Sequence, residues 1–300
     1  MTAYLLEGAW VAGAVRDDVL VEIEDGRFTS VTPDTPVSRI GRLSAGISAG
    51  QQPFHRPAGE IEHLPGLTLP GFANCHSHVF HRALRGRTQR ERGTFWTWRD
   101  QMYDVAARLD PDSLFLLARA TYREMVAAGM TCVGEFHYLH HQPDGTPYDD
   151  PNAMSHALVA AADEAGIRLT LLDTCYLSSG FGEPPQGVQR RFSDGDVDRW
   201  CERVDALRST GRVRHGAAVH SVRAVPPEAM PTIAGWAADR PLHAHVSEQV
   251  AENEACLARH GLTPTGVLAD RGVLGPRTTA VHATHLTDED VDLLARSGTT

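Results

Sequence analysis

The stretch that decides the fold is Leu67-Thr68-Leu69-Pro70-Gly71-Phe72-Ala73-Asn74-Cys75-His76-Ser77-His78. Its apolar run predicts a β-strand over Leu67 to Cys75, and two histidines follow at the carboxyl end of that strand. Side chains alternate along a strand, so His76 and His78 point to the same face. No G-x-G-x-x-G fingerprint follows the strand, which favours a barrel of βα units over a doubly wound dinucleotide-binding sheet.

Downstream, short apolar runs alternate with longer helical patterns, as is typical of βα units around a parallel sheet. Five more strands are predicted at Thr131 to Phe136, Arg168 to Cys175, Arg214 to His220, Leu242 to Val246 and Thr279 to Ala283. Helices are predicted at Pro111 to Ala128, Asn152 to Ala165, Asp194 to Ser209, Pro226 to Ala238, Glu248 to His260 and Asp288 to Ala295, the last with Thr287 and Gly298 as caps. The pattern predicts an α/β fold, a (β/α)8 TIM barrel over residues 64–300.

Only about six of the eight βα units of such a barrel can be placed. A barrel that stops there leaves two open sheet edges, and unpaired edges favour aggregation. We therefore expect a C-terminally truncated barrel; the alternative is a complete open sheet of six units. Sequencing the coding DNA beyond codon 300 separates the two, because the truncated barrel requires two further βα units.

The first 63 residues predict a separate N-terminal β-sandwich-like subdomain. Its runs Val19 to Glu24 and Arg27 to Val31 are joined by Asp25-Gly26, a strong hairpin signal. Residues 41–59 are rich in Gly, Ser, Ala, Pro and Gln, which indicates a loop or linker within this subdomain.

Composition excludes several functions. All 28 basic residues are arginine, so a Schiff-base lysine, a pyridoxal phosphate anchor, a Walker A loop and a carboxylated lysine bridging two metals are all ruled out. A net charge of -10 disfavours a nucleic-acid surface. Five scattered cysteines without a C-x-x-C pair, together with the lack of a secretory signal or an apolar membrane span, predict a cytoplasmic protein with no membrane partner.

Histidines at the ends of strands one, five and six predict a metal centre, because side chains at the carboxyl ends of barrel strands meet at one mouth. His76, His78 and His245 would supply three imidazoles and leave a zinc ion an open position. Spacing alone does not choose between His245 and His243, which have the same parity. Glu248 is placed to move a proton between water and a nitrogen, and His282 to polarise the substrate.

Other histidines are assigned to loops and packing. They are His137, His140, His141, His156 and His285. The pair His140-His141 resembles part of a second metal site, but no lysine is available to bridge two metals.

Several stretches resemble the metal-dependent amidohydrolase superfamily and, within it, the N-formimino-L-glutamate deiminases. The superfamily features are the start of the first barrel strand, the His245-x-x-Glu248 motif and His282. Three stretches resemble the deiminases specifically, and they are Phe95 to Tyr103, Gly134 to His141 and His220 to Val225.

The resemblance implies zinc-dependent hydrolysis of N-formimino-L-glutamate to N-formyl-L-glutamate and ammonia in histidine degradation. It implies that His76, His78 and His245 hold one Zn²⁺ per subunit, although iron or manganese would also accept these ligands. Glu248 and His282 are implied as catalytic residues. The substrate-binding residues are implied to be Arg99, Tyr138, Arg223, His220 and His81, where His81 replaces the Gln of many members. We also expect a homodimer, because barrels of this kind often pair.

One expected ligand is missing. In the family, an Asp at the end of the eighth strand binds the metal and orients the attacking water, and residues 1–300 end before a seventh strand. We therefore expect this chain to hold zinc weakly or not at all. The alternative functions are a mononuclear amidohydrolase acting on a nucleobase or a triazine, and a truncated, non-catalytic remnant.

Overall fold

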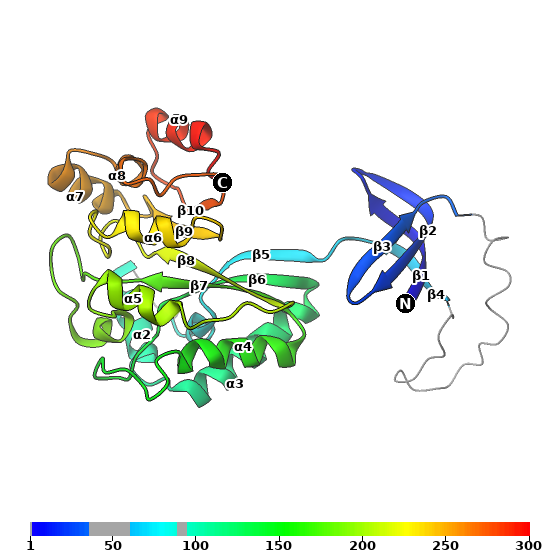
Figure 1. The fold of residues 1–300 in the computed structure, drawn as a ribbon, viewed down its shortest axis with the longest axis horizontal. Helices are drawn as coiled ribbons and strands as arrows, with labels where there is room; N and C mark the ends of the chain where they lie inside the picture. Colours follow the sequence, from blue (N-terminus) through cyan, green and yellow to red (C-terminus); the bar gives the residue numbers. More distant parts are fainter. Residues whose placement is uncertain (1, 36–60, 89–94) are drawn as a thin grey trace. The chain divides into compact units, whose positions relative to one another are not determined.

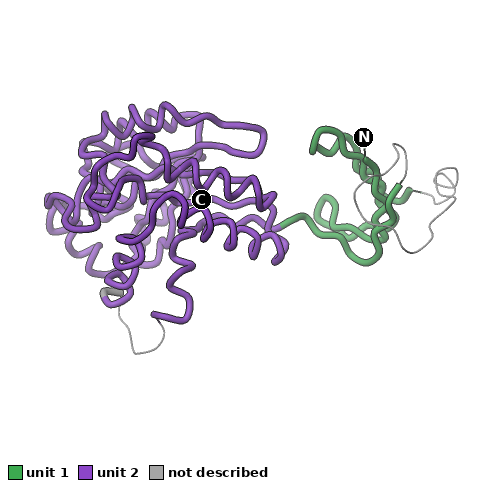
Figure 2. Tube along the Cα trace, turned by 90° about the horizontal axis from the view of Figure 1, so that it is seen from below, with its two compact units in different colours: residues 1–71 green, residues 72–300 purple. Residues whose placement is uncertain are grey.

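The computed structural model describes residues 2–35, 61–88 and 95–300. It divides into two compact units, Met1–Gly71 and Phe72–Thr300 (Figure 2). The sequence placed this boundary at residue 63, inside the strand that closes the first unit. The linker expected at residues 41–59 lies outside the described residues.

The N-terminal unit is a four-stranded sheet of order β3-β2-β1-β4. Its strands are β1 (Thr2–Val11), β2 (Ala14–Glu24), β3 (Arg27–Thr32) and β4 (Ile61–Thr68). The predicted hairpin is confirmed: Glu24 pairs with Arg27, and both turn residues, Asp25 and Gly26, have positive φ as a type I′ turn requires. The described part of this unit holds one sheet and no second layer.

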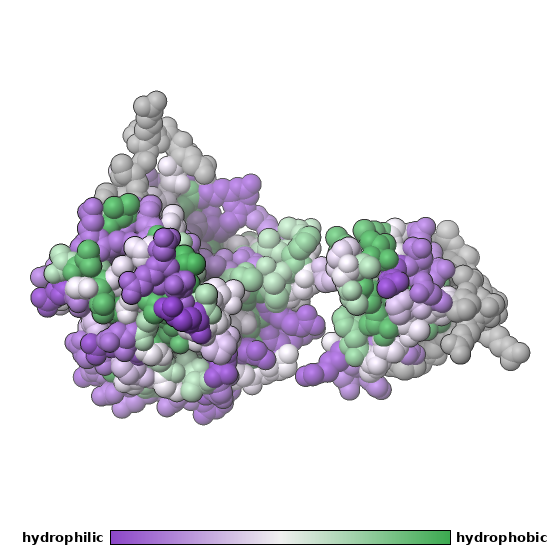
Figure 3. Space-filling model, turned by 90° about the horizontal axis from the view of Figure 1, so that it is seen from above, coloured by the Kyte–Doolittle hydropathy of each residue, from purple (hydrophilic) through white to green (hydrophobic). Residues whose placement is uncertain are grey.

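The sheet of the N-terminal unit leaves large hydrophobic side chains exposed. Leu6, Ala9, Val19 and Val21 form a small buried core, while Trp10 and Phe28 are exposed by 47% and 71%. Hydrophobic residues gather on the face of this unit seen in Figure 3. The sheet therefore buries little apolar area of its own.

The second unit is built on six parallel strands in the order β10-β9-β8-β7-β6-β5 (Figure 1). The strands are β5 (Phe72–Ser77), β6 (Met130–His137), β7 (Arg168–Cys175), β8 (Val213–Val219), β9 (Leu242–Val246) and β10 (Thr278–His282). This order, with each strand beside its sequence neighbour, is that of a TIM-like barrel and confirms the predicted fold class.

Helices connect the strands. They are α2 (Phe95–Ala106), α3 (Pro111–Ala127), α4 (Ala153–Ala165), α5 (Val197–Val204), α6 (Met230–Trp236), α7 (Val250–His260), α8 (Pro264–Asp270) and α9 (Asp288–Ser297), with 3₁₀ helices η1 (Val79–Leu84) and η2 (Gly187–Phe192). Both predicted caps of α9 are confirmed, since the Thr287 side chain accepts from the Asp290 N–H and Gly298 is left-handed.

The prediction of one continuous strand from Leu67 to Cys75 is wrong. The structure divides it into the end of β4 in the first sheet and β5 in the second. Pro70 lies between them, and a proline cannot donate to a strand ladder, so the chain changes sheets there. His76 lies in β5, and His78 follows its last residue.

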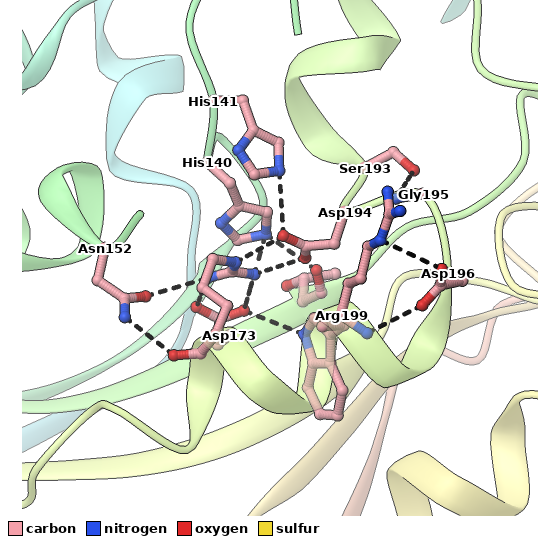
Figure 4. A network of polar contacts seen from close by, with 12 residues as sticks. His140, His141, Asn152, Asp173, Ser193, Asp194, Gly195, Asp196 and Arg199 are labelled. Carbon is pink, nitrogen blue, oxygen red and sulfur yellow. Dashed lines mark hydrogen bonds and ion pairs between the residues drawn. The ribbon is translucent and has the colours of Figure 1, made fainter. Parts of the chain in front are cut away.

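A buried ionic network joins the outer side of β7 to α5 and the loop before it (Figure 4). The guanidinium of Arg203 makes two bonds to Asp173, at 2.8 and 2.9 Å, and two to Asp194, at 2.8 and 2.9 Å. His141 contacts Asp194 at 3.0 Å, and Trp200 donates its indole N–H to Asp173. This network fixes the loops that follow β6 and precede α5.

Among the described residues, no helix is long and apolar enough to cross a membrane.

Candidate metal centre and its pocket

Curvature of the second sheet brings the predicted ligands together. Three strands separate β5 from β9 in the sheet order, which in a flat sheet is about 19 Å at the usual strand spacing. Nevertheless, the Nε2 atoms of His76 and His245 are 3.4 Å apart. Only a sheet that curls as a barrel does places these two side chains in contact.

The three imidazoles form a triangle of nitrogen atoms. The Nε2–Nε2 distances are 3.1 Å for His76–His78, 3.2 Å for His78–His245 and 3.4 Å for His245–His76. A tetrahedral site with zinc–nitrogen bonds of about 2.0–2.1 Å has nitrogen–nitrogen edges of about 3.3–3.4 Å. The triangle therefore fits a metal ion, and it is the only such cluster of potential metal ligands among the described residues.

Two of the rings have their tautomer set by the backbone. His78 Nδ1 lies 2.8 Å from the carbonyl of Phe136, and His245 Nδ1 lies 2.9 Å from that of His220. A carbonyl only accepts, so each Nδ1 carries the proton and each Nε2 presents a lone pair. Two facing lone pairs cannot bond to each other and repel, so a cation between them stabilises the arrangement.

Burial keeps these rings neutral. It lowers the pKa of His78 and of His245 well below the ordinary value, and neighbouring histidine charges add to the effect. The pKa of His76 falls to about 4, first by burial and then by His282 and His243. Neutral imidazole is the form that binds metal.

Spacing left the choice between His243 and His245 open, and the structure places His245 in the cluster. It stacks on the Phe136 ring at 4.2 Å and completes the nitrogen triangle. His243 lies two residues earlier in β9 and is not part of the cluster. Burial lowers the pKa of His243 to about 4.

Glu248 and His282 lie beside the triangle at strand ends with unusual backbone. The φ angles of Ser247 and His282 are +51° and +71°, values that non-glycine residues seldom adopt. This backbone brings His282 Nε2 to 4.0 Å from Glu248 Oε2, and the His282 ring stacks on His245 with 5.2 Å between centroids. A carboxylate and an imidazole thus share the edge of the centre.

A single pocket of about 390 Å³ contains the triangle. Its lining includes all ten residues that the sequence assigned to the site, namely His76, His78, His81, Arg99, Tyr138, His220, Arg223, His245, Glu248 and His282. The structure therefore brings every predicted site residue together, while their individual roles stay predictions.

The pocket also carries cations and phenols besides the triangle. Arg223 is held by a 3.1 Å bond from its Nε to the buried carboxylate of Glu252. Arg99 reaches from α2 and lies over the ring of Tyr103. The Tyr138 hydroxyl lies 2.9 Å from His81 Nε2, and burial raises the pKa of Tyr138 well above its usual value, so it stays a donor. The two guanidiniums and the phenol of this pocket suit anionic groups.

Seven lining residues were not among the predicted ones, and three of them, Tyr103, Tyr176 and Gln189, carry hydrogen-bonding groups joined to one another. Tyr176 follows the last residue of β7, so the rule that barrel sites form at the carboxyl ends of strands would have found it. Tyr103 lies within the stretch that resembles the deiminases. Gln189 lies in η2, and nothing local in the sequence distinguishes it.

The histidines assigned to packing do not form a second metal centre among the described residues. His140 and His141 are buried in the network of Asp173 and Asp194, on the outer side of the sheet. Arg203 already binds both carboxylates there, so a metal ion would have to displace its guanidinium.

Comparisons with known proteins agree with this geometry. The chain is 40% identical over 249 residues to the formimidoylglutamate deiminase of Pseudomonas aeruginosa, covering 80% of this chain and 55% of that protein. It is 30% identical to the 8-oxoguanine deaminase of the same organism, covering 86% of this chain and 58% of the relative. The chain thus spans a little over half the length of these relatives.

Solved structures share the fold. An amidohydrolase from Brucella melitensis superposes with a TM-score of 0.86 at 33% identity, covering 100% of this chain and 64% of that one. An atrazine chlorohydrolase from Arthrobacter aurescens TC1, complexed with zinc, superposes with a TM-score of 0.80 at 22% identity, with the same coverage. Residues 67–300 match the amidohydrolase family. The curled parallel sheet, the histidine triangle and these matches together show that the chain belongs to the amidohydrolase family.

Proposed function

We propose that the protein hydrolyses the formimino group of N-formimino-L-glutamate, giving N-formyl-L-glutamate and ammonia, with zinc held by His76, His78 and His245. One observation carries the proposal: a single pocket joins the histidine triangle to two arginines, Arg99 and Arg223. A substrate with a reacting amidine at one end and two carboxylates at the other matches this polarity. The similarity to the deiminase of Pseudomonas aeruginosa supports the same assignment.

The carboxylates would be held by the arginines and by Tyr138. Guanidinium groups bind carboxylates through paired N–H donors, and the bond from Arg223 to Glu252 fixes one guanidinium before the substrate arrives. His81 orients the Tyr138 hydroxyl, and His220 closes the pocket behind it with its ring 5.2 Å from that of Tyr138. These contacts would place the formimino carbon at the histidine triangle.

The chemical step needs one water, one proton acceptor and one proton donor. When bound, a zinc ion would supply Lewis acidity and lower the pKa of a water molecule. Glu248 would accept a proton from the attacking water and give it to the imino nitrogen. It would then pass the remaining proton of the added oxygen to the same nitrogen, so that the C–N bond breaks, the formyl C=O forms and ammonia departs. His282, stacked on His245, would donate to the oxygen that gains charge at the formimino carbon.

We further propose that this reaction takes place in the cytoplasm, as a step of histidine degradation. All five cysteines are free thiols, a state that a reducing compartment maintains.

The products distinguish this reaction from other hydrolyses of the same compound. Zinc-loaded protein, made from the full-length gene, should convert N-formimino-L-glutamate to equal amounts of ammonia and N-formyl-L-glutamate, followed by proton NMR. Removing the metal with a chelator should stop the reaction, and adding zinc back should restore it. Formation of formamide and glutamate instead, or turnover that survives metal removal, would contradict the proposal.

A further inference from the structure

Gln189 links two tyrosines that come from distant parts of the chain. Its Nε2 lies 3.0 Å from the Tyr103 hydroxyl on α2 and 3.0 Å from the Tyr176 hydroxyl just after β7. Gln189 itself is buried, and all three side chains line the pocket. An amide is thus held between two phenols at the wall of the site.

The direction of these hydrogen bonds follows from a third contact. The backbone N–H of Gln186 donates to Gln189 Oε1 at 3.0 Å. A backbone N–H can only donate, so the amide oxygen must face Gln186 and the amide nitrogen must face the phenols. Both amide protons of Gln189 are therefore given to the tyrosines, whose oxygens accept.

A phenol that accepts from Gln189 keeps its own proton for another partner. The two hydroxyls also contact each other, and this contact uses at most one of their two protons. At least one O–H therefore remains to donate into the pocket. Burial raises the pKa of Tyr176 well above its usual value, so this proton is retained at neutral pH.

The surroundings of the phenols are positively charged. Arg223 and Arg99 are both close enough to Tyr176 to act on its pKa, each in the lowering direction, although burial outweighs them. Arg99 also lies over the ring of Tyr103, at 5.5 Å from its centroid. A ligand group that meets two guanidiniums and a phenolic donor is an anion with oxygen acceptors, and a carboxylate fits this description.

We propose that Gln189 is a positioning residue that turns the Tyr103 and Tyr176 hydroxyls toward a substrate carboxylate held by Arg99 and Arg223. The proposal rests on the proposed function and adds a specificity element to it. It also explains why the residue is a glutamine. A glutamate here would accept hydrogen bonds from both phenols, so neither O–H group would be left to donate to the substrate. It would also place a negative charge against the incoming carboxylate.

Kinetics of two variants test this role. Gln189→Glu should raise KM for N-formimino-L-glutamate about tenfold or more, with kcat within about threefold, because one or more charge-assisted hydrogen bonds are lost. Gln189→Met, which only releases the phenols, should raise KM by a smaller factor. Formamidine, which has the reacting group but no carboxylate, should be turned over by both variants as by the wild type. Glu183→Gln, which changes one charge at an exposed position shortly before η2, is the control.

Binding of glutarate, measured by calorimetry, separates this proposal from the proposed function. Glutarate should bind the wild type and bind Gln189→Glu about tenfold more weakly. If the wild type does not act on N-formimino-L-glutamate but shows this binding difference, the proposed function fails and the role of Gln189 stands. The role is overturned if both Gln189 variants bind glutarate as the wild type does, if the wild type binds none, or if the variants lose formamidine turnover equally. Should Gln189→Glu not fold, Tyr176→Phe must weaken glutarate binding in its place.

Discussion

At the scale of single residues, the chemistry depends on where one carboxylate lies. Glu248 follows the strained Ser247, and its own N–H donates to the buried Glu252 at 3.1 Å. The same Glu252 holds Arg223 through its other oxygen. One buried carboxylate therefore contacts both Glu248, the proposed proton-transfer residue, and Arg223, a proposed substrate-binding residue.

We predict that Glu248→Gln lowers kcat by about 10²–10⁴-fold and leaves KM within about threefold, because an amide cannot accept the proton of the attacking water. Initial rates of ammonia release across substrate concentrations measure both constants. Glu254→Gln, at an exposed position of α7, is the matched control and should behave as the wild type. A kcat for Glu248→Gln close to that of the wild type would remove Glu248 from the mechanism.

Arg99→Ala should mainly raise KM, whereas Glu248→Gln should mainly lower kcat. Loss of a guanidinium that meets a carboxylate should raise KM by about tenfold or more while kcat falls less, because the reacting group is remote. Arg108→Ala, which removes an exposed arginine just beyond the same helix, serves as the control. Equal effects of the two substitutions would show that Arg99 acts only through general charge.

At the scale of elements, the metal centre depends on how closely β5 and β6 approach. Gly134 in β6 allows this approach, because a Cβ built there would lie 2.8 Å from the carbonyl oxygen of Cys75, next to His76. Real Cβ atoms do not come so near to backbone oxygen, so a side chain must push β5 away.

We therefore predict that Gly134→Ala weakens zinc binding by about tenfold or more, the size of effect seen when the groups supporting metal ligands are disturbed. A competition titration against a zinc indicator measures this affinity. Gly235→Ala in α6, where an added Cβ meets no atom within 4 Å, is the control. Unchanged zinc affinity in Gly134→Ala would show that β5 is not positioned by this contact.

The network between β7 and α5 should govern stability toward acid. Burial alone would raise the pKa of Asp173, but Arg203 and neighbouring histidines outweigh it and bring the pKa to about 2. A carboxyl with a lowered pKa in the folded state stabilises that state above its unfolded pKa of about 4, and this contribution is lost as pH falls toward 2.

Asp173→Asn should accordingly lower the free energy of unfolding by about 3–5 kcal/mol at neutral pH, because it leaves Arg203 with an incomplete partner. The difference from the wild type should shrink as pH falls from about 4 to about 2. Urea unfolding at a series of pH values measures this trend, with the exposed Asp163→Asn as control. A difference that stays constant with pH would assign the loss to packing instead of charge.

For the molecule as a whole, periodicity in the sequence predicted most of the second unit. The bounds of β7 and β9 are as predicted, because both are apolar runs with clear ends. The helix α2 was missed, since Phe95-Trp96-Thr97-Trp98 is poor in strong helix formers. A split between two sheets at Pro70 was also missed, because an apolar run does not show which sheet its residues join.

The part of the candidate site that lies in or next to the strands was predictable from the sequence. His76, His78, His245 and His282 lie in or next to strands whose ends could be located, so their convergence followed from the barrel. Gln189 could not be found in this way, because it enters the pocket on a 3₁₀ helix whose position depends on tertiary contacts. The position of His245 rather than His243 in the triangle likewise became evident only from the three-dimensional structure.

The central claim is that this amidohydrolase acts on a small dicarboxylate amidine and not on a base. The most direct test compares two values of kcat/KM for the zinc-loaded, full-length protein. One is for N-formimino-L-glutamate, and the other is for 8-oxoguanine, the base in the name of the related deaminase from Pseudomonas aeruginosa. We predict a preference for N-formimino-L-glutamate of at least about 10³-fold, since a neutral ring offers the arginines and phenols no anionic group to bind. A higher kcat/KM for 8-oxoguanine would contradict the account.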